Sequence, residues 1–146
     1  MSSKYNSKKV NVDGITFASK DEARYYEYLK DLKAKEKILN FELQPKFVII
    51  PKFKYQGKTE REATYALDFL VYNLDGTETY IDVKSLGTST QQGLLKYKLL
   101  KYQHSELNFK WICRNKKYGD ADGWIPYDEL KKLYNKRKKE KINSSL

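Results

Sequence analysis

The spacing of hydrophobic residues along the chain predicts a helix, then strands, then a helix, a strand and a final helix. The first helix is expected over about 20–35, because Tyr25, Leu29 and Leu32 recur at helical intervals. Helices that enclose a set of strands in this way are typical of a sheet covered by helices. We therefore expect an α/β fold with a central mixed β-sheet.

Alternating apolar residues and turn signals define the remaining elements. Asp75-Gly76 is a strong hairpin signal, so the strands on either side of it should be antiparallel neighbours. Pro45 and Pro51 interrupt the first apolar stretch and place it at a sheet edge. Strands are expected at 38–55 (one or two short ones), 64–73, 79–84 and 108–115, loops at 56–63 and 117–124, and further helices at 90–104 and 126–142.

The second helix carries a candidate core stripe, and the termini are basic. Leu95, Leu99 and Tyr102 recur at helical spacing and are expected to face the core. The domain prediction has three parts: a flexible basic arm at 1–14, a folded domain at 15–130 and a basic C-terminal helix or tail at 131–146.

Composition and charge narrow the class of function. The 146 residues suit one domain with a core, and the net charge of +10 favours a polyanionic partner, most commonly nucleic acid. The alternative is a soluble protein that is merely rich in lysine. One histidine and one cysteine, Cys113, cannot build a zinc site and favour a reducing, cytoplasmic location. No apolar run approaches the roughly 18 residues of a membrane span.

Two aspartates interrupt the two best strands. Asp82 and Lys84 share one face of the strand at 79–84, and Asp68 shares a face with Ala66 and Leu70. The hairpin can bring Asp68 close to Asp82, although a slip of two residues would separate them. The alternative is that both aspartates are exposed and paired with lysines.

Like charges brought together in a partly apolar site need a cation. Without a histidine or cysteine cluster, Mg²⁺ or Mn²⁺ is the natural choice. Glu22 is a third candidate carboxylate, because it lies on the side of the first helix that faces the sheet. Its alternative role is structural, since Ser19 and Glu22 have the spacing of a capping box.

The segments SKDEARYYEYL, QPKF, YALDF and YIDVKS, the last followed by a helix, resemble the PD-(D/E)XK nuclease superfamily. More narrowly, they are similar to small phage-encoded proteins of the Holliday-junction resolvase and phage endonuclease I kind. The resemblance covers roughly residues 10–115. It implies a restriction-endonuclease-like core in the order α-β-β-β-α-β-α. Two positions depart from the motif: Leu67 stands where proline is usual, and Asp82 where many relatives have glutamate.

The resemblance also implies roles for five residues. Asp68 and Asp82 would bind the metal together with the carbonyl of Val83, Glu22 would support metal binding, and Lys84 would be the catalytic lysine. Next to carboxylates a lysine stays charged, so orientation of water and electrostatic stabilisation are favoured over a role as base.

The expected activity is Mg²⁺-dependent endonuclease cleavage of DNA, structure-specific for branched DNA such as Holliday junctions, by a homodimer in the host cytoplasm. A non-catalytic DNA-binding module on the same scaffold is the alternative. A sequence-specific restriction enzyme is less favoured, because no spare domain is present for readout. An RNA substrate stays open.

Polar side chains outside the motif are candidate DNA contacts. Gln44 interrupts an apolar strand, and its alternative role is a buried structural amide. Lys96, Lys98 and Lys101 follow the motif on the second helix, and the alternative is that they form a charged face in contact with solvent only. His104 is expected at an exposed helix end, and Cys113 as a buried small hydrophobe. The DNA-contact candidates are Gln44, Gln91, Gln92, Lys96, Lys98, Lys101, Lys136, Arg137 and Lys138, with Lys4, Lys8 and Lys9 in the N-terminal arm.

Overall fold

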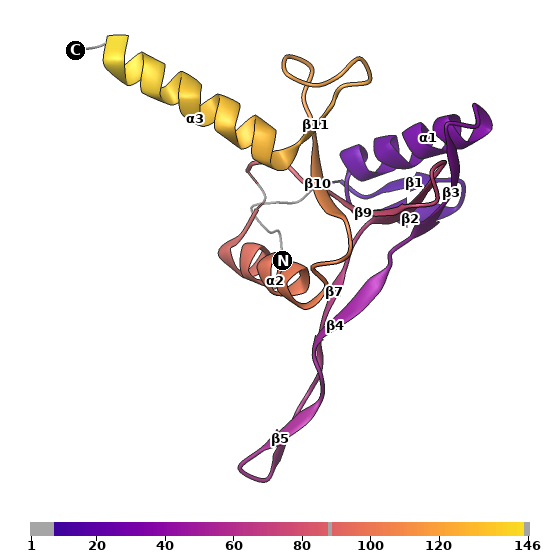
Figure 1. Ribbon diagram of the computed structural model, residues 1–146, viewed down its shortest axis with the longest axis vertical. Coiled ribbons are helices and arrows are strands. Elements are labelled where there is room, and N and C mark those ends of the chain that lie inside the picture. The colour runs from indigo at the N-terminus through magenta and orange to yellow at the C-terminus, as the bar shows by residue number, and fades with distance from the viewer. Residues whose placement is uncertain (1–7, 88, 145–146) are drawn as a thin grey trace.

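The protein is described by a computed structural model that covers residues 8–87 and 89–144 (Figure 1). A central five-stranded mixed sheet with three helices confirms the predicted α/β class. The elements in chain order are β1 (Val10–Val12), β2 (Ile15–Phe17), α1 (Lys20–Ala34), β3 (Ile38–Leu43), β4 (Lys46–Ile50), β5 (Phe53–Tyr55), β6 (Lys58–Glu60), β7 (Ala63–Ala66), β8 (Phe69–Asn73), β9 (Glu78–Val83), α2 (Gln91–Gln103), β10 (Phe109–Arg114), β11 (Trp124–Pro126) and α3 (Tyr127–Ser144). None of the helices in these two segments is long and apolar enough to cross a membrane.

The central sheet has the strand order β11-β10-β9-β8-β3. β3, β8 and β9 form an antiparallel meander, β10 runs parallel to β9, and β11 pairs antiparallel with β10. The hairpin between β8 and β9 turns at Asp75-Gly76, as predicted. Asp75 Oδ1 accepts the N–H of Thr77 at 2.9 Å, and Gly76 takes the positive φ of 87° that favours glycine.

Helix α1 covers one face of the central sheet. Ser19 caps its start, because the Ser19 Oγ accepts the N–H of Glu22 at 3.1 Å. Aromatic side chains dominate the core beneath it, and the Tyr25 ring packs edge-on against Trp124 at 4.8 Å. Phe17 is also buried and packs against the Tyr26 ring. The helix ends at Ala34, one residue before its predicted end.

Helices α2 and α3 pack on the other side. The predicted stripe on α2 is wrong at Leu95 and Tyr102, whereas Leu99 is partly buried against the core, as predicted. Leu95 is 68% exposed and Tyr102 is 84% exposed, whereas Leu100 is completely buried. Leu100 packs with Ile49 of β4 and Tyr65 of β7. Leucines occur on several sides of this helix, so periodicity alone could not select the side that contacts β4 and β7.

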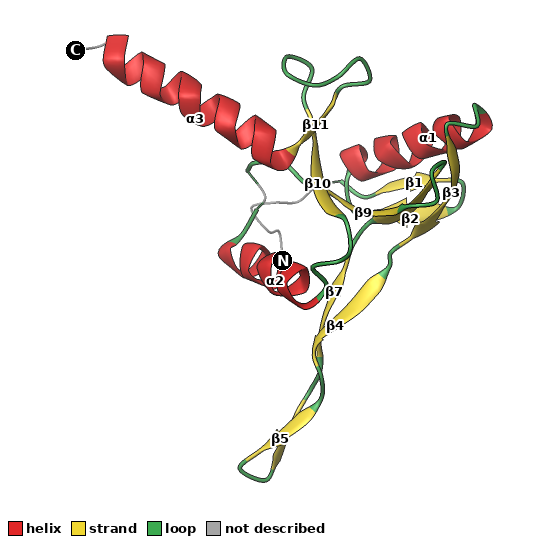
Figure 2. Ribbon diagram, viewed as in Figure 1, coloured by secondary structure: helices red, strands yellow, loops and turns green. Residues whose placement is uncertain are grey.

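The strand predicted at 64–73 is two strands, because the chain bends at Leu67 and Asp68. On the opposite strand of the ribbon, between β3 and β4, Gln44 has a left-handed φ of 52° and is followed by Pro45. Two backbone bonds hold the bend together: Gln44 N–H to Asp68 O and Leu67 N–H to Pro45 O, both 2.9 Å. The ribbon of β3 and β8 therefore leaves the central sheet and continues as β4 and β7 (Figure 2).

Three further expectations were wrong because short strands replace predicted loops or arms. Part of the expected flexible arm at 1–14 is β1, which pairs with β2 across a turn at Asp13 and Gly14. Residues 1–7, including Lys4, lie outside the described residues. Part of the expected loop at 56–63 is β6, paired with β5, and β11 begins at Trp124, the end of the expected loop at 117–124. These strands add elements to the expected order α-β-β-β-α-β-α.

Candidate active site

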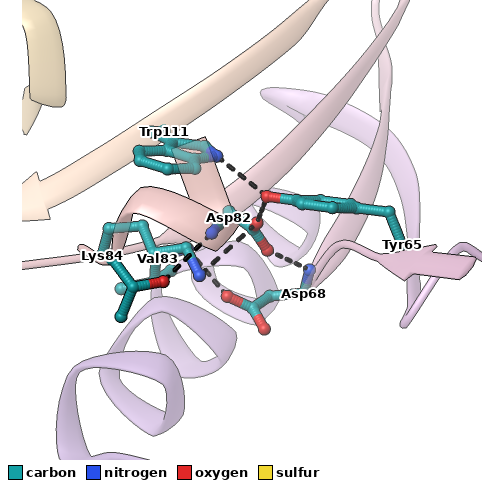
Figure 3. Close-up of polar contacts among 8 residues, drawn as sticks. Tyr65, Asp68, Asp82, Val83, Lys84 and Trp111 are labelled. Carbon is teal, nitrogen blue, oxygen red and sulfur yellow. Dashed lines mark hydrogen bonds and ion pairs between the residues drawn. The ribbon is translucent and has the colours of Figure 1, made fainter. Parts of the chain in front are cut away.

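The bend in the ribbon brings Asp68 to the C-terminal end of β9. β8 and β9 pair with Phe69 opposite Ile81, so Asp68 and Asp82 come next in the same register. The Asp68 N–H donates both to Ile81 O and to Asp82 Oδ1, each at 3.0 Å. In return, the Val83 N–H donates to Asp68 Oδ2 at 2.7 Å (Figure 3). The predicted proximity of the two aspartates is therefore confirmed.

Asp82 is buried in a hydrogen-bonded aromatic setting. The residue is only 2% exposed, and its Oδ2 accepts a hydrogen bond from the Tyr65 hydroxyl. The Tyr65 oxygen in turn accepts the indole N–H of Trp111 at 3.1 Å. The exposed-aspartate alternative is thus wrong for Asp82.

Sequence reasoning missed Tyr65 and Trp111. Trp111 lies opposite Asp82 because β10 pairs parallel with β9. Tyr65 comes from β7, beyond the bend at Asp68. Neither the parallel register nor the bend leaves a local signal in the sequence, because both depend on packing between distant segments.

Lys84 lies beside Asp82 at the end of β9. Its Nζ is 3.8 Å from Asp82 Oδ2 and 5.3 Å from the centre of the Trp111 ring. The Lys84 side chain keeps about a third of its surface exposed (34%), whereas that of Asp82 keeps 3%. The ammonium group can therefore balance the buried carboxylate and still meet a ligand from the solvent side.

Glu22 caps α1 and also reaches the site. Its Oε2 accepts a hydrogen bond from the N–H of Ala18 at 2.8 Å. In a standard capping box this bond would come from the N–H of the N-cap residue, Ser19, so here it is displaced by one residue. The Asp68 carboxyl is also in hydrogen-bonding contact with the Glu22 carboxyl, and this contact raises the pKa of Asp68. The two readings of Glu22 are therefore compatible, because the same side chain caps the helix and contacts Asp68.

A cavity of about 170 Å³ opens beside this carboxyl pair. Polar side chains on its wall include Glu22, Gln44 and Asp68, and Phe17 and Leu43 contribute apolar surface. Gln44 thus joins the site from the opposite side of the bend. Gln44 is exposed, which excludes the alternative that it is a buried structural amide.

The carboxyl groups destabilise each other's charge. Burial, the hydrogen bond to Glu22 and the nearby charge of Asp82 raise the pKa of Asp68 to about 10. Burial also raises the pKa of Asp82, although Lys84 and the Tyr65 hydroxyl oppose that shift. Burial and the Asp82 charge raise the pKa of Tyr65, so its hydroxyl keeps its proton and remains a donor to Asp82. Asp68 therefore holds a proton where a cation could take its place.

The donor chemistry of this site fits a hard cation. Glu22, Asp68 and Asp82 offer only oxygen, which suits Mg²⁺ or Mn²⁺. In the described segments, no group of three or more His, Cys, Asp or Glu side chains is spaced to hold an ion. Both Asp82 oxygens accept hydrogen bonds, Oδ2 from the Tyr65 hydroxyl and Oδ1 from the Asp68 N–H. The Val83 carbonyl as a metal ligand stays a prediction.

The other candidate DNA contacts lie outside this cavity. Lys101 stacks over the Tyr97 ring at 4.3 Å on α2, and α3 projects from the body of the protein (Figure 1). His104 is partly buried against Phe47, with ring centres 5.0 Å apart, so its predicted exposure is wrong. Cys113 is buried, as predicted. The exposed candidates on these helices are Gln91, Gln92, Lys98, Lys101, Lys136, Arg137 and Lys138, and Lys96 is partly buried.

Replacing Tyr65 by Phe should lower the free energy of unfolding by about 1–3 kcal/mol, as expected when buried polar groups lose a partner. The change removes the donor to Asp82 and the acceptor of the Trp111 N–H. Urea unfolding measures the effect, and Tyr102→Phe on the exposed face of α2 is the matched control. Equal stability of the two variants would show that the Tyr65 hydroxyl does not hold Asp82.

Comparison with known proteins gives one family match. No curated protein and no solved structure matches the chain. A family described as "Protein of unknown function (DUF1064)" matches residues 2–120, which include every element from β1 to β10 and the whole candidate site. The chain therefore belongs to the DUF1064 family.

Proposed function

We propose that this protein is a metal-dependent endonuclease that hydrolyses phosphodiester bonds in DNA. The observation that carries the proposal is a chain of contacts in which Glu22 adjoins Asp68, Asp68 adjoins Asp82, and Asp82 adjoins Lys84. These residues come from α1, from the bend before β8 and from the end of β9. Segments far apart in the chain thus converge on one acidic group with one lysine beside it, which favours a chemical role over a solvated sheet edge.

The order of the elements around the site supports the same proposal. Without the added hairpins, α1 precedes the meander of β3, β8 and β9, and α2 leads to β10, which runs parallel to β9. This arrangement agrees with the core implied by the resemblance to PD-(D/E)XK nucleases. The net charge of +10 supports a polyanionic substrate.

The site residues divide the work of phosphodiester hydrolysis. A bound Mg²⁺ or Mn²⁺ would supply charge neutralisation for the phosphate and a more acidic water. Asp68, Asp82 and the Val83 carbonyl would hold the ion, with support from Glu22. Tyr65 and Trp111 position Asp82 through their hydrogen bonds, and they exclude water from its inner side.

Lys84 acts on the substrate side of this group. Its ammonium is 3.8 Å from Asp82, close enough to orient a water or to meet the charge that develops on the phosphate. Gln44 lines the cavity beside Asp68 and is placed to donate to a phosphate oxygen. The basic residues of α2 and α3 would bind flanking phosphates and add salt-dependent affinity.

The finer parts of the proposal concern substrate and assembly. We favour branched DNA, such as a four-way junction, and a homodimer, because junction cleavage needs two symmetric nicks. A cytoplasmic location, in a bacterial host if the protein is phage-encoded, completes this proposal. The second candidate is a non-catalytic DNA-binding module. It is favoured by one observation: in the described segments no three metal-ligand side chains are already spaced around an ion.

A cleavage assay separates these functions. The protein is incubated with linear, forked and four-way DNA, with Mg²⁺ or with EDTA. We expect cuts only with Mg²⁺ and fastest on four-way DNA. Binding to all three substrates without any metal-dependent cut would favour the module and overturn the enzyme proposal.

A further inference from the structure

The ribbon of β4 and β7 extends beyond the body of the protein as a long two-stranded arm, residues 51–62 (Figure 2). Its tip is the hairpin of β5 and β6, with Phe53 opposite Glu60 and Tyr55 opposite Lys58. Gln56 and Gly57 form the turn with φ of 49° and 79°, the positive angles of a tight hairpin turn. The arm is therefore regular β-structure, although the sequence predicted a loop in its second half.

Every residue from 51 to 62 is exposed, so the arm buries nothing against the rest of the chain. An isolated two-stranded hairpin is only marginally stable in water, and its open edges are a liability. Two aromatic side chains nevertheless lie in the open, with Phe53 46% exposed and Tyr55 61% exposed. Nothing within the described fold accounts for these features, which points to a binding partner.

The charge of the arm identifies the class of partner. Lys52, Lys54, Lys58 and Arg61 outnumber the two acidic residues Glu60 and Glu62. Within the described residues, none of the four cations makes an ion pair. Cross-strand partners share a face, so Lys58 lies on the Tyr55 face and Lys54 lies on the other. Cations on both faces suit a site that has phosphates on both sides.

We propose that the arm enters the major groove of B-form DNA. That groove is about 12 Å wide and about 8.5 Å deep and admits a two-stranded β-ribbon. At about 3.3 Å per residue, the strand from Ile50 to the turn at Gln56 spans about 20 Å, enough to reach the groove floor. The major groove of A-form RNA is too narrow for side chains to read, so the shape of the arm favours DNA.

The arm is mechanically continuous with the candidate active site. Its strands pass through β4 and β7 to the bend where Gln44 N–H bonds to Asp68 O. Phosphates on the two groove walls would meet Lys54 on one face and Lys58 on the other, and the turn at Gln56 and Gly57 would approach the base edges. Groove binding would therefore set the position of the duplex relative to Asp68. This inference rests on the proposed function only for its choice of DNA substrate.

Binding measurements without metal test the arm separately from catalysis. Fluorescence anisotropy in EDTA compares a B-form DNA duplex with an RNA duplex of the same sequence. In the first variant Asn-Gly replaces residues 51–62 and joins Ile50 to Ala63, which are already cross-strand partners. The second carries Lys54→Glu and Lys58→Glu. The control carries Lys33→Glu and Lys37→Glu, an equal charge change at exposed positions at the end of α1.

We expect both arm variants to bind the DNA duplex about 10- to 100-fold more weakly at roughly 0.1 M salt, with the slope of log K against log salt reduced by about 1.8 for two lost phosphate contacts. The control should lose little, and the wild type and the control, but neither arm variant, should prefer DNA over RNA. Thermal unfolding checks that each variant folds. Equal losses in the control and the arm variants would overturn the proposal, as would wild-type affinity in the shortened variant.

The outcomes for arm and active site are separable. Loss of binding in the arm variants, together with no Mg²⁺-dependent cutting by the wild type, would support the arm and overturn the proposed enzyme. Normal binding by the arm variants with cutting intact would overturn the arm alone. A dimer that dissociates when the arm is shortened, with duplex binding unchanged, would identify a second copy of the chain as the occupant and overturn the DNA proposal.

Discussion

The Asp82→Asn variant is expected to cut DNA about 10²- to 10³-fold more slowly than the wild type in Mg²⁺, the range seen when one electrostatic group of an active site is removed. Asparagine has nearly the same shape and can still accept the Asp68 N–H, which Asp82 Oδ1 accepts at 3.0 Å. The change therefore removes a charge from the acidic group with little change in packing. Initial rates on the best of the linear, forked and four-way substrates give the measurement.

Asp31→Asn is the matched control, because Asp31 is exposed on α1 and forms its ion pair with Lys35 at the end of the same helix. Its rate should equal that of the wild type. Duplex binding by Asp82→Asn in EDTA should also stay near the wild-type value, which separates catalysis from affinity. Wild-type cleavage by the Asp82 variant would show that the site is assigned wrongly.

The metal-free protein should become less stable as the pH rises from about 5.5 to about 8, by up to about 1.4 kcal/mol per pH unit. Asp68 has an ordinary pKa of 3.8 when unfolded, and burial beside Glu22 and Asp82 raises it to about 10 in the fold. Between these values the native state holds a proton that the unfolded chain has lost, so rising pH favours unfolding. Below pH 3.8 both states are protonated, and the dependence on Asp68 disappears.

Urea unfolding in EDTA at several pH values measures this dependence. Asp68→Asn should flatten the profile, because its amide does not titrate, and Glu22→Gln tests the same cluster if that variant folds poorly. Added Mg²⁺ should stabilise the wild type more at about pH 8 than at about pH 5.5, since a cation must displace the proton on Asp68. Identical pH profiles for wild type and Asp68→Asn would contradict the raised pKa.

Local rules predicted the parts of this fold that neighbouring residues control. Ser19 caps α1 because a side-chain oxygen can satisfy the open N–H groups of the first turn. Asp75-Gly76 sets the turn between β8 and β9 and, with it, the register that aligns Asp68 with Asp82. The α/β class, both of these elements and the proximity of the two aspartates could therefore be predicted from the sequence.

Other features depend on contacts between distant segments. Asp68 meets the N–H of Val83 because Gln44 and Pro45 bend the opposite strand at the same level. Because of that bend, one expected strand is two strands, and the ribbon that carries the arm leaves the central sheet. The side of α2 that is buried was decided in the same way, by its contact with β4 and β7.

The sequence by itself determined the side chains of the candidate site, three carboxylates and one lysine, and the basic character of the chain. Only the tertiary structure decided their setting, in which Tyr65 and Trp111 hold Asp82, Glu22 adjoins Asp68, and the arm extends from the same bend. The physical reason is that residue types and turn signals act locally. Burial and the pairing of distant strands arise only when the whole chain packs.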